Sequence, residues 1–130
     1  MSENFDRSKY KVLVVDDENL IADILTEELD DLGYQSFSVY NAKDALEVIE
    51  KESIDLVISD IKMPIASGID LLKESMQRNP ESPVFVMMTG YADFDEKMLI
   101  EMGAKKLLDK PFNFDLIDEL VKSILLEGSR

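Results

Sequence analysis

The stretch VLVVDDEN, residues 12–19, poses the first question about this chain. Its four apolar residues suit a strand that is buried on both faces, yet three carboxylates follow immediately. Neighbouring carboxylates repel one another, and an unpaired carboxylate is costly to bury. The crowding therefore predicts that a compensating group is placed beside them.

Similar apolar runs return along the chain and alternate with helical patterns. Besides the run at 11–16, short Val- and Ile-rich segments predict strands at 55–60 and 83–89, a half-buried edge strand at 35–40 and a weaker one at 105–110. Apolar residues at helical spacing predict helices over 19–32, 42–51, 68–78, 94–102 and 114–126. Gly33 stands where a glycine would end the first helix. Five strand–helix repeats predict a single α/β domain with a parallel sheet covered on both faces.

Composition narrows the class of protein. The 130 residues, 45% of them hydrophobic, suit one domain with a real core. No apolar run reaches the roughly 18 residues of a membrane span, and the N-terminus lacks the apolar segment of a signal peptide. We therefore expect no membrane insertion and a cytoplasmic location. The net charge of −14 argues against direct nucleic-acid binding, and the absence of His and Cys excludes sites built on those side chains.

Polar side chains stand at the ends of the predicted strands. Asp16 and Asp17 end the first strand, Asp60 the third, Thr89 the fourth and Lys110 the fifth. An aspartate after a strand is often a helix cap or turn former, so each residue taken alone is open to that reading. Ligands of open parallel sheets bind beyond the carboxyl ends of the strands. The joint occurrence therefore predicts one shared pocket.

The residue types suggest a chemistry for this pocket. Clustered carboxylates without histidine or cysteine suit a hard cation, and Mg²⁺ is the natural choice, with Mn²⁺ as a substitute. Lys110 alone does not neutralise three carboxylates. A phosphate beside the metal would complete the site, with Lys110 pairing with one oxygen and the Thr89 hydroxyl bonding another.

Four motifs together resemble the receiver domain of response regulators. They are VLVVDDE, VISDIKMP with Gly68 four residues after its proline, MMTGY, and GAKKLLDKPF. The resemblance covers a receiver domain over 10–126, which leaves 1–9 as a polar leader and 127–130 as a tail. It implies a three-layer flavodoxin-like (βα)5 fold with five parallel strands in the order 2-1-3-4-5.

The resemblance also implies the metal ligands. Asp60 matches the phosphoacceptor and is itself an expected ligand of Mg²⁺. Asp17 matches the residue that binds the metal directly, and Asp16 the residue that binds it through water. The backbone carbonyl of Lys62 is the remaining expected protein ligand.

The same resemblance implies a mechanism. Thr89 matches the switch hydroxyl, and Lys110 matches the lysine of the Lys-Pro motif, whose peptide bond to Pro111 is cis in similar domains. A sensor histidine kinase or phosphotransfer protein would transfer its phosphoryl group from phosphohistidine to Asp60, in line and with Mg²⁺ stabilising the charge. Water would later hydrolyse the acyl phosphate. The chain would be a signalling switch rather than an enzyme acting on other molecules.

Partners follow from the same resemblance. Phosphorylation would bias an existing two-state equilibrium and alter binding of a downstream protein at the face built from the fourth helix, fifth strand and fifth helix. The chain would act without an output domain of its own, or would be a piece of a longer regulator. Ile100 is expected to be exposed on that face, whereas methionines 87, 88, 98 and 102 are interpreted as core residues.

Two positions leave alternatives open. Such domains usually carry Tyr or Phe three residues before the lysine, but Leu107 stands here. Either Leu107 packs under the fourth helix and coupling to Thr89 is weaker or uses another group, which we favour, or Tyr91 supplies the aromatic group. The Lys62 side chain either hangs over the mouth of the site and steers the hydrolytic water, or is an ordinary solvated lysine.

Other functional classes fit less well. A phosphatase with an aspartyl nucleophile would need Asp-x-Asp after the first strand, where Asp16-Asp17-Glu18 stands. A flavodoxin-like binder of flavin mononucleotide would need a phosphate-cradling loop there, and an acidic loop would repel that phosphate. An interaction module that works without phosphorylation is disfavoured by the intact set of acidic, hydroxyl and lysine residues.

Overall fold

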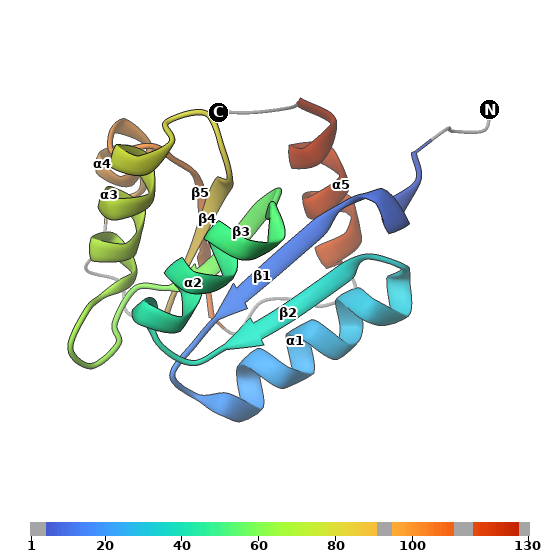
Figure 1. Ribbon diagram of the computed structural model, residues 1–130, viewed down its shortest axis with the longest axis horizontal. Coiled ribbons are helices and arrows are strands. Elements are labelled where there is room, and N and C mark those ends of the chain that lie inside the picture. The colour runs from blue at the N-terminus through green and yellow to red at the C-terminus, as the bar shows by residue number, and fades with distance from the viewer. Residues whose placement is uncertain (1–4, 91–94, 111–115, 128–130) are drawn as a thin grey trace.

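A five-stranded parallel sheet forms the middle layer of the molecule (Figure 1). The computed structural model describes residues 5–90, 95–110 and 116–127. The strand order is β2-β1-β3-β4-β5, and every neighbouring pair is parallel, as expected. The strands are β1 (Lys11–Val15), β2 (Gln35–Val39), β3 (Leu56–Asp60), β4 (Val84–Thr89) and β5 (Ala104–Asp109).

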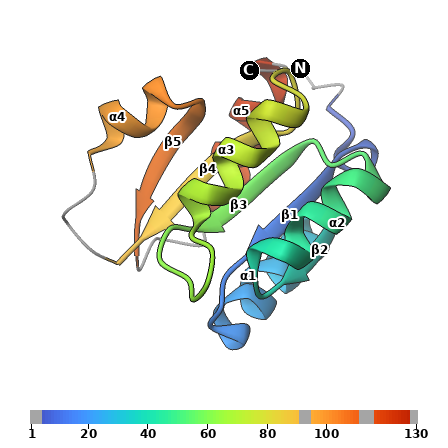
Figure 2. The same ribbon diagram turned by 60° about the vertical axis from the view of Figure 1, so that its left-hand side comes forward.

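Helices cover both faces of the sheet (Figure 2). A core cluster on one face joins α1 and α5 to the sheet, and a second cluster on the other face joins α2, α3 and α4 to it. The three-layer flavodoxin-like arrangement is therefore confirmed. The helices are α1 (Asn19–Leu32), α2 (Ala42–Glu52), α3 (Gly68–Arg78), α4 (Glu96–Glu101) and α5 (Ile117–Glu127), and a short 3-10 turn, η1 (Arg7–Lys9), precedes β1.

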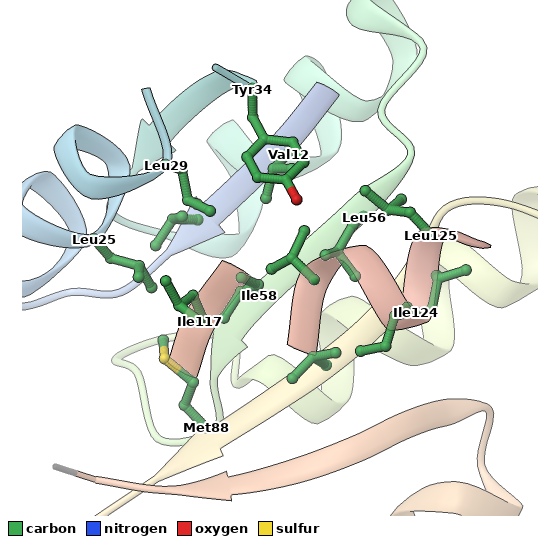
Figure 3. Close-up of a cluster of buried hydrophobic side chains, with 14 of the residues drawn as sticks. Val12, Leu25, Leu29, Tyr34, Leu56, Ile58, Met88, Ile117, Ile124 and Leu125 are labelled. Atoms are coloured by element: carbon green, nitrogen blue, oxygen red, sulfur yellow. The ribbon is translucent and has the colours of Figure 1, made fainter. Parts of the chain in front are cut away.

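Strand alternation explains why there are two cores. Val12 and Val14 of β1 enter the cluster under α1 and α5, whereas Leu13 and Val15 enter the opposite one. In Figure 3, Leu25 of α1 and Ile117 of α5 converge on the same face of the sheet. All residues of the strands β3 and β4 are buried, which is why both begin with apolar runs and show no alternation of polar and apolar residues.

Helix limits agree closely with the sequence pattern at α1 and α3, which begin and end at the predicted residues. Gly33 ends α1 with a left-handed φ of 112°, a conformation that glycine adopts without steric cost. The fourth helix is shorter than predicted, Glu96–Glu101 against 94–102. Residue 94 lies outside the described residues, as do 114 and 115 of the predicted fifth helix.

One core assignment on α4 is wrong. Met98 is 43% exposed, although Met87 and Met88 are fully buried and Met102 packs partly against the core. The short helix turns Leu99 toward the sheet, and consecutive helical residues point about 100° apart, so Met98 faces outward. Ile100 is 49% exposed, as expected.

The end of the predicted leader is docked. Phe5 stacks on Tyr10 with ring centroids 5.1 Å apart, and Arg7 pairs with Asp118 of α5. Residues 1–4 and 128–130 lie outside the described residues, so the leader and tail boundaries stay predictions. Within the part of the chain that is described, no helix combines the length and apolarity needed to cross a membrane.

Candidate phosphoacceptor site

Sheet topology brings the predicted site residues together at one edge. Asp16 directly follows β1, and Asp60 ends β3, the strand paired with β1. The Asp16 N–H still donates to the carbonyl oxygen of Val39 at 3.2 Å, which fixes its backbone against β2. Thr89 ends β4, beside β3, and is only 1% exposed. Three segments that are distant along the chain therefore supply one site, because parallel strands all end at the same edge.

Lys110 completes the group from β5. Its N–H donates to the Thr89 carbonyl oxygen at 2.8 Å, one residue after β5 ends. Its Nζ lies 2.7 Å from Asp16 Oδ2, 3.5 Å from Asp60 Oδ1 and 3.7 Å from a Glu18 carboxylate oxygen. One ammonium thus faces several carboxylates, and the negative charge is left in surplus.

Three of these carboxylates suit a divalent cation. Asp16, Asp17 and Asp60 each offer an oxygen, and the three oxygens lie within 4.8 Å of one another. Asp16 is fully buried and Asp60 is 7% exposed, whereas Asp17 faces solvent. A hard cation held by carboxylates while retaining several waters would fit such a half-open donor set. The neighbouring cavity measures about 480 Å³ and is lined by Asp17, Glu18, Asp60, Lys62, Gly90 and Lys110.

Burial and the neighbouring carboxylates both raise the pKa of Asp60. Burial, followed by the negative charge of Asp16, raises the pKa of Asp60 to about 6, and the smaller effect of Lys110 opposes this rise. Burial alone would lower the pKa of Lys110, but its hydrogen bond to Asp16 and the surrounding carboxylates raise that pKa above its usual value. Asp60 therefore carries its charge at a cost that a nearby cation would relieve.

The loop after β3 is held tightly against Asp60. The Gly68 N–H donates to the Ile61 carbonyl oxygen at 2.7 Å. A Cβ at Gly68 would lie 2.2 Å from the Asp60 carbonyl oxygen, so only glycine fits. Ser67 and Asp70 form a reciprocal capping box that starts α3 at this point.

Leu107 lies where the sequence interpretation favoured it. Its side chain is partly buried in the cluster that contains Leu99 and Met102, next to α4. Its N–H donates to Glu96 Oε2 at 2.9 Å, so the start of α4 is tied to the middle of β5. Sequence reasoning missed Glu96, because a side chain bonded to a backbone N–H eleven residues away leaves no mark in motif or periodicity.

Two further residues refine the sequence interpretation. Lys62 lines the mouth of the cavity beside Asp60, although its effect on water stays a prediction. Glu18 occupies the N-cap of α1, but its side chain makes no capping bond and approaches Lys110 instead. The predicted cis bond to Pro111 and the alternative aromatic Tyr91 lie outside the described residues; the cis bond observed is Ser82–Pro83.

Comparison with known proteins identifies one family. The family model of the response regulator receiver domain matches residues 12–122. Sporulation initiation phosphotransferase F of Bacillus subtilis is 38% identical over 116 residues, which cover 88% of this chain and 93% of that protein. Response regulator protein PilR of Pseudomonas aeruginosa is 35% identical over 119 residues, or 91% of this chain. The chain spans only 26% of PilR.

Solved structures give the same result. A CheY-like response regulator receiver domain protein from Methanospirillum hungatei is 31% identical with a TM-score of 0.84, over 91% of this chain and 94% of that one. Response regulator protein TrrA from Thermotoga maritima, in complex with Mg(2+)-BeF, is 34% identical with a TM-score of 0.78, over 88% and 98%. With the acidic triad, Thr89 and Lys110 at the carboxyl edge of a 2-1-3-4-5 sheet, the chain belongs to the response regulator receiver domain family of two-component signalling.

Proposed function

We propose that this receiver domain accepts a phosphoryl group on Asp60 from the phosphohistidine of a sensor kinase or phosphotransfer protein. The observation that carries the proposal is the cluster of carboxylates around Asp60, which pairs with Lys110 and is open to a cavity. Repulsion between such crowded carboxylates disfavours the folded state, and a bound cation would relieve this repulsion. An acidic loop after β1 also argues against a flavin phosphate at this edge.

Asp16, Asp17 and Asp60 would hold a divalent cation, with Mg²⁺ as the natural occupant. The expected arrangement has Asp17 and Asp60 as direct ligands with the Lys62 carbonyl, and Asp16 acting through water. Bound Mg²⁺ would supply charge neutralisation for an incoming phosphoryl group. The structural relative in complex with Mg(2+)-BeF supports this assignment.

The protein groups then divide the work of transfer. The Asp60 carboxylate forms a P–O bond while the P–N bond to the donor histidine breaks. With a pKa of about 6, Asp60 is mostly ionised near neutral pH and able to attack. Lys110 Nζ, already 3.5 Å from Asp60, would bond one phosphoryl oxygen and the Thr89 hydroxyl another. Water at the mouth beside Lys62 would later hydrolyse the acyl phosphate.

Phosphorylation would be coupled to partner binding through β5, the strand at the neighbouring edge of the sheet. Thr89 on β4 lies opposite Asp109 of β5, and β5 is tied to α4 through the Leu107–Glu96 bond. Met98 and Ile100 of α4 present apolar surface to solvent. A downstream protein would bind the α4-β5-α5 face, and phosphorylation would shift the population of the binding conformation. The protein would thus switch a partner rather than turn over a substrate.

Incubation with acetyl phosphate and Mg²⁺, followed by intact mass measurement, tests the chemical step. We expect one added phosphoryl group, which requires Mg²⁺ and is absent in Asp60→Asn. Asp31→Asn, at an exposed aspartate on α1, is the matched control and should be phosphorylated like the wild type. No modification of the wild type, together with no Mg²⁺ binding, would defeat the proposal.

A further inference from the structure

β5 forms an outer edge of the sheet. It stands last in the strand order, so among the described strands it pairs with β4 alone. N–H groups alternate between the two sides of a strand, and the Lys110 N–H points to β4, where it bonds the Thr89 carbonyl oxygen at 2.8 Å. The Leu107 N–H, three residues earlier, therefore points away from β4. An N–H on such an edge needs an acceptor other than a strand.

Glu96, in the first turn of α4, supplies that acceptor. Its Oε2 lies 2.9 Å from the Leu107 nitrogen, and both residues are half-buried. Within the described ranges no ion pair involves Glu96, so its carboxylate is committed to the strand. Hydrogen bonds to an ionised carboxylate are stronger than neutral ones. Because α4 is only six residues long, one such bond has a large effect on where the helix lies.

The strand that Glu96 holds also carries a lysine of the site around Asp60. Lys110 follows Leu107 by three residues, and its Nζ lies 3.5 Å from Asp60 Oδ1. Its nearest carboxylate at present is Asp16, at 2.7 Å. A phosphoryl group on Asp60 would attract the ammonium toward its own oxygens. A displacement of β5 that followed would reach α4 through the bond to Glu96.

We propose that Glu96 is a positioning residue that couples the exposed surface of α4, which contains Met98 and Ile100, to Lys110 and Asp60. The inference rests on the proposed function and assigns the group that connects its two ends. Coupling between two sites is reciprocal. A partner bound to this surface of α4 would therefore alter the phosphorylation of Asp60 through the same bond.

Hydrogen exchange of the full ¹⁵N-labelled chain tests the bond itself. The Leu107 amide should exchange about tenfold faster in Glu96→Ala than in wild type, the factor expected for loss of one hydrogen bond to a charged group. Glu96→Gln keeps an acceptor oxygen but loses the charge, and should give an intermediate rate. Glu101→Ala, at an exposed residue at the other end of α4, is the control and should leave the rate unchanged. Equal exchange in Glu96→Ala and wild type would overturn the proposal.

Amide chemical shifts before and after addition of acetyl phosphate and Mg²⁺ test the coupling. In wild type we expect changes at Lys110 and at Met98 and Ile100. Glu96→Ala should keep the change at Lys110, because the site still reacts, and should lose most of the change on α4. Glu96→Gln should restore part of it, and Glu101→Ala should respond like wild type. Intact mass of the same samples gives the phosphorylated fraction, so that the shifts are compared at equal modification.

The outcomes separate this role from a purely structural one. Full-sized changes at Met98 and Ile100 in phosphorylated Glu96→Ala would show that Glu96 only covers the edge of the sheet, and would overturn the proposal. A wild type that gains no phosphoryl group would defeat the proposed function and the coupling with it, even where the exchange of Leu107 shows that the bond exists.

Discussion

Two acidic regions of this molecule use charge in opposite ways. At the carboxyl edge, Asp16, Asp17 and Asp60 crowd together with one lysine. On α5, Asp118 accepts two bonds from Arg7, at 2.9 and 2.7 Å, and one from the Tyr34 hydroxyl at 2.9 Å. The hydrogen bonds from Arg7 hold the pKa of Asp118 below its usual value, although burial opposes them, whereas burial and charge raise that of Asp60.

The contrast separates stability from function. The Asp118 carboxylate is matched within the fold, and the rings of Phe5 and Tyr34 lie beside the same Arg7 guanidinium, 5.5 and 6.0 Å from it. The carboxylates near Asp60 outnumber the charge of Lys110, which pairs with Asp16 and Asp60. We therefore expect mutation of the first region to weaken the fold, and mutation of the second to strengthen the metal-free fold while removing activity.

The largest effect on stability is expected from mutation of Asp118. Asp118→Ala removes a bidentate ion pair and a tyrosine bond that are about three-quarters buried, with side-chain exposures of 28% and 26% for Arg7 and Asp118. The free energy of unfolding should fall by about 2 kcal/mol, measured by urea denaturation. Glu119→Gln, at an exposed neighbour, is the control and should change little. Equal stability of Asp118→Ala and wild type would show that Asp118 does not stabilise the fold.

Addition of Mg²⁺ should have the second-largest effect on stability. A cation that binds only the folded protein stabilises it by about 1.4 kcal/mol at ten times its dissociation constant. Thermal unfolding with and without Mg²⁺ measures the effect, and Asp60→Asn should reduce it. A rise of the same size in Asp60→Asn would place the cation elsewhere.

Asp60→Asn should raise the stability of the metal-free protein. The neutral amide removes a carboxylate that is charged at a cost, and we expect a gain of about 1 kcal/mol at pH 7.5 in the presence of a chelator. Urea denaturation of the two proteins checks this. A less stable Asp60→Asn variant would show that the Asp60 carboxylate does not destabilise the metal-free protein.

The pH dependence follows from the same shift. Because the pKa of Asp60 rises from 3.8 to about 6 on folding, the folded state holds more protons between these values. The stability contributed by protonated Asp60 is therefore complete below pH 3.8 and lost as pH rises through 6. In chelator, wild type should lose stability from pH 5 to 7.5 relative to Asp60→Asn. Parallel curves for the two proteins would contradict this assignment.

The smallest effect on metal-free stability is expected from mutation of Asp17. This aspartate faces solvent, which screens its repulsion with Asp16 and Asp60, so Asp17→Asn should raise the metal-free melting temperature only slightly. The same change should weaken the response to Mg²⁺ strongly, because Asp17 is an expected direct ligand. A lower metal-free melting temperature would count against strain in the acidic cluster.

Topology explains why much of the fold and site was predictable. Once the apolar runs indicated a parallel sheet, Asp16, Asp60, Thr89 and Lys110 had to meet at its carboxyl edge. These residues end strands, and strand ends are visible in sequence. Their roles in phosphorylation came from the motif resemblance and remain predictions.

The remaining features depend on contacts that no spacing encodes. Arg7 and Asp118 lie 111 positions apart, and neither belongs to a recognisable motif. Exposure of Met98 depends on where a short helix begins, which periodicity places only within a few residues.

The contact of Gly68 with Asp60 has a mechanical consequence. With no side chain between them, the first residue of α3 packs directly on the backbone of Asp60. The helix is eleven residues long and spans about 16 Å from Gly68 to Arg78. A displacement of the Asp60 backbone would therefore push directly on the first turn of α3 and move the helix as a unit.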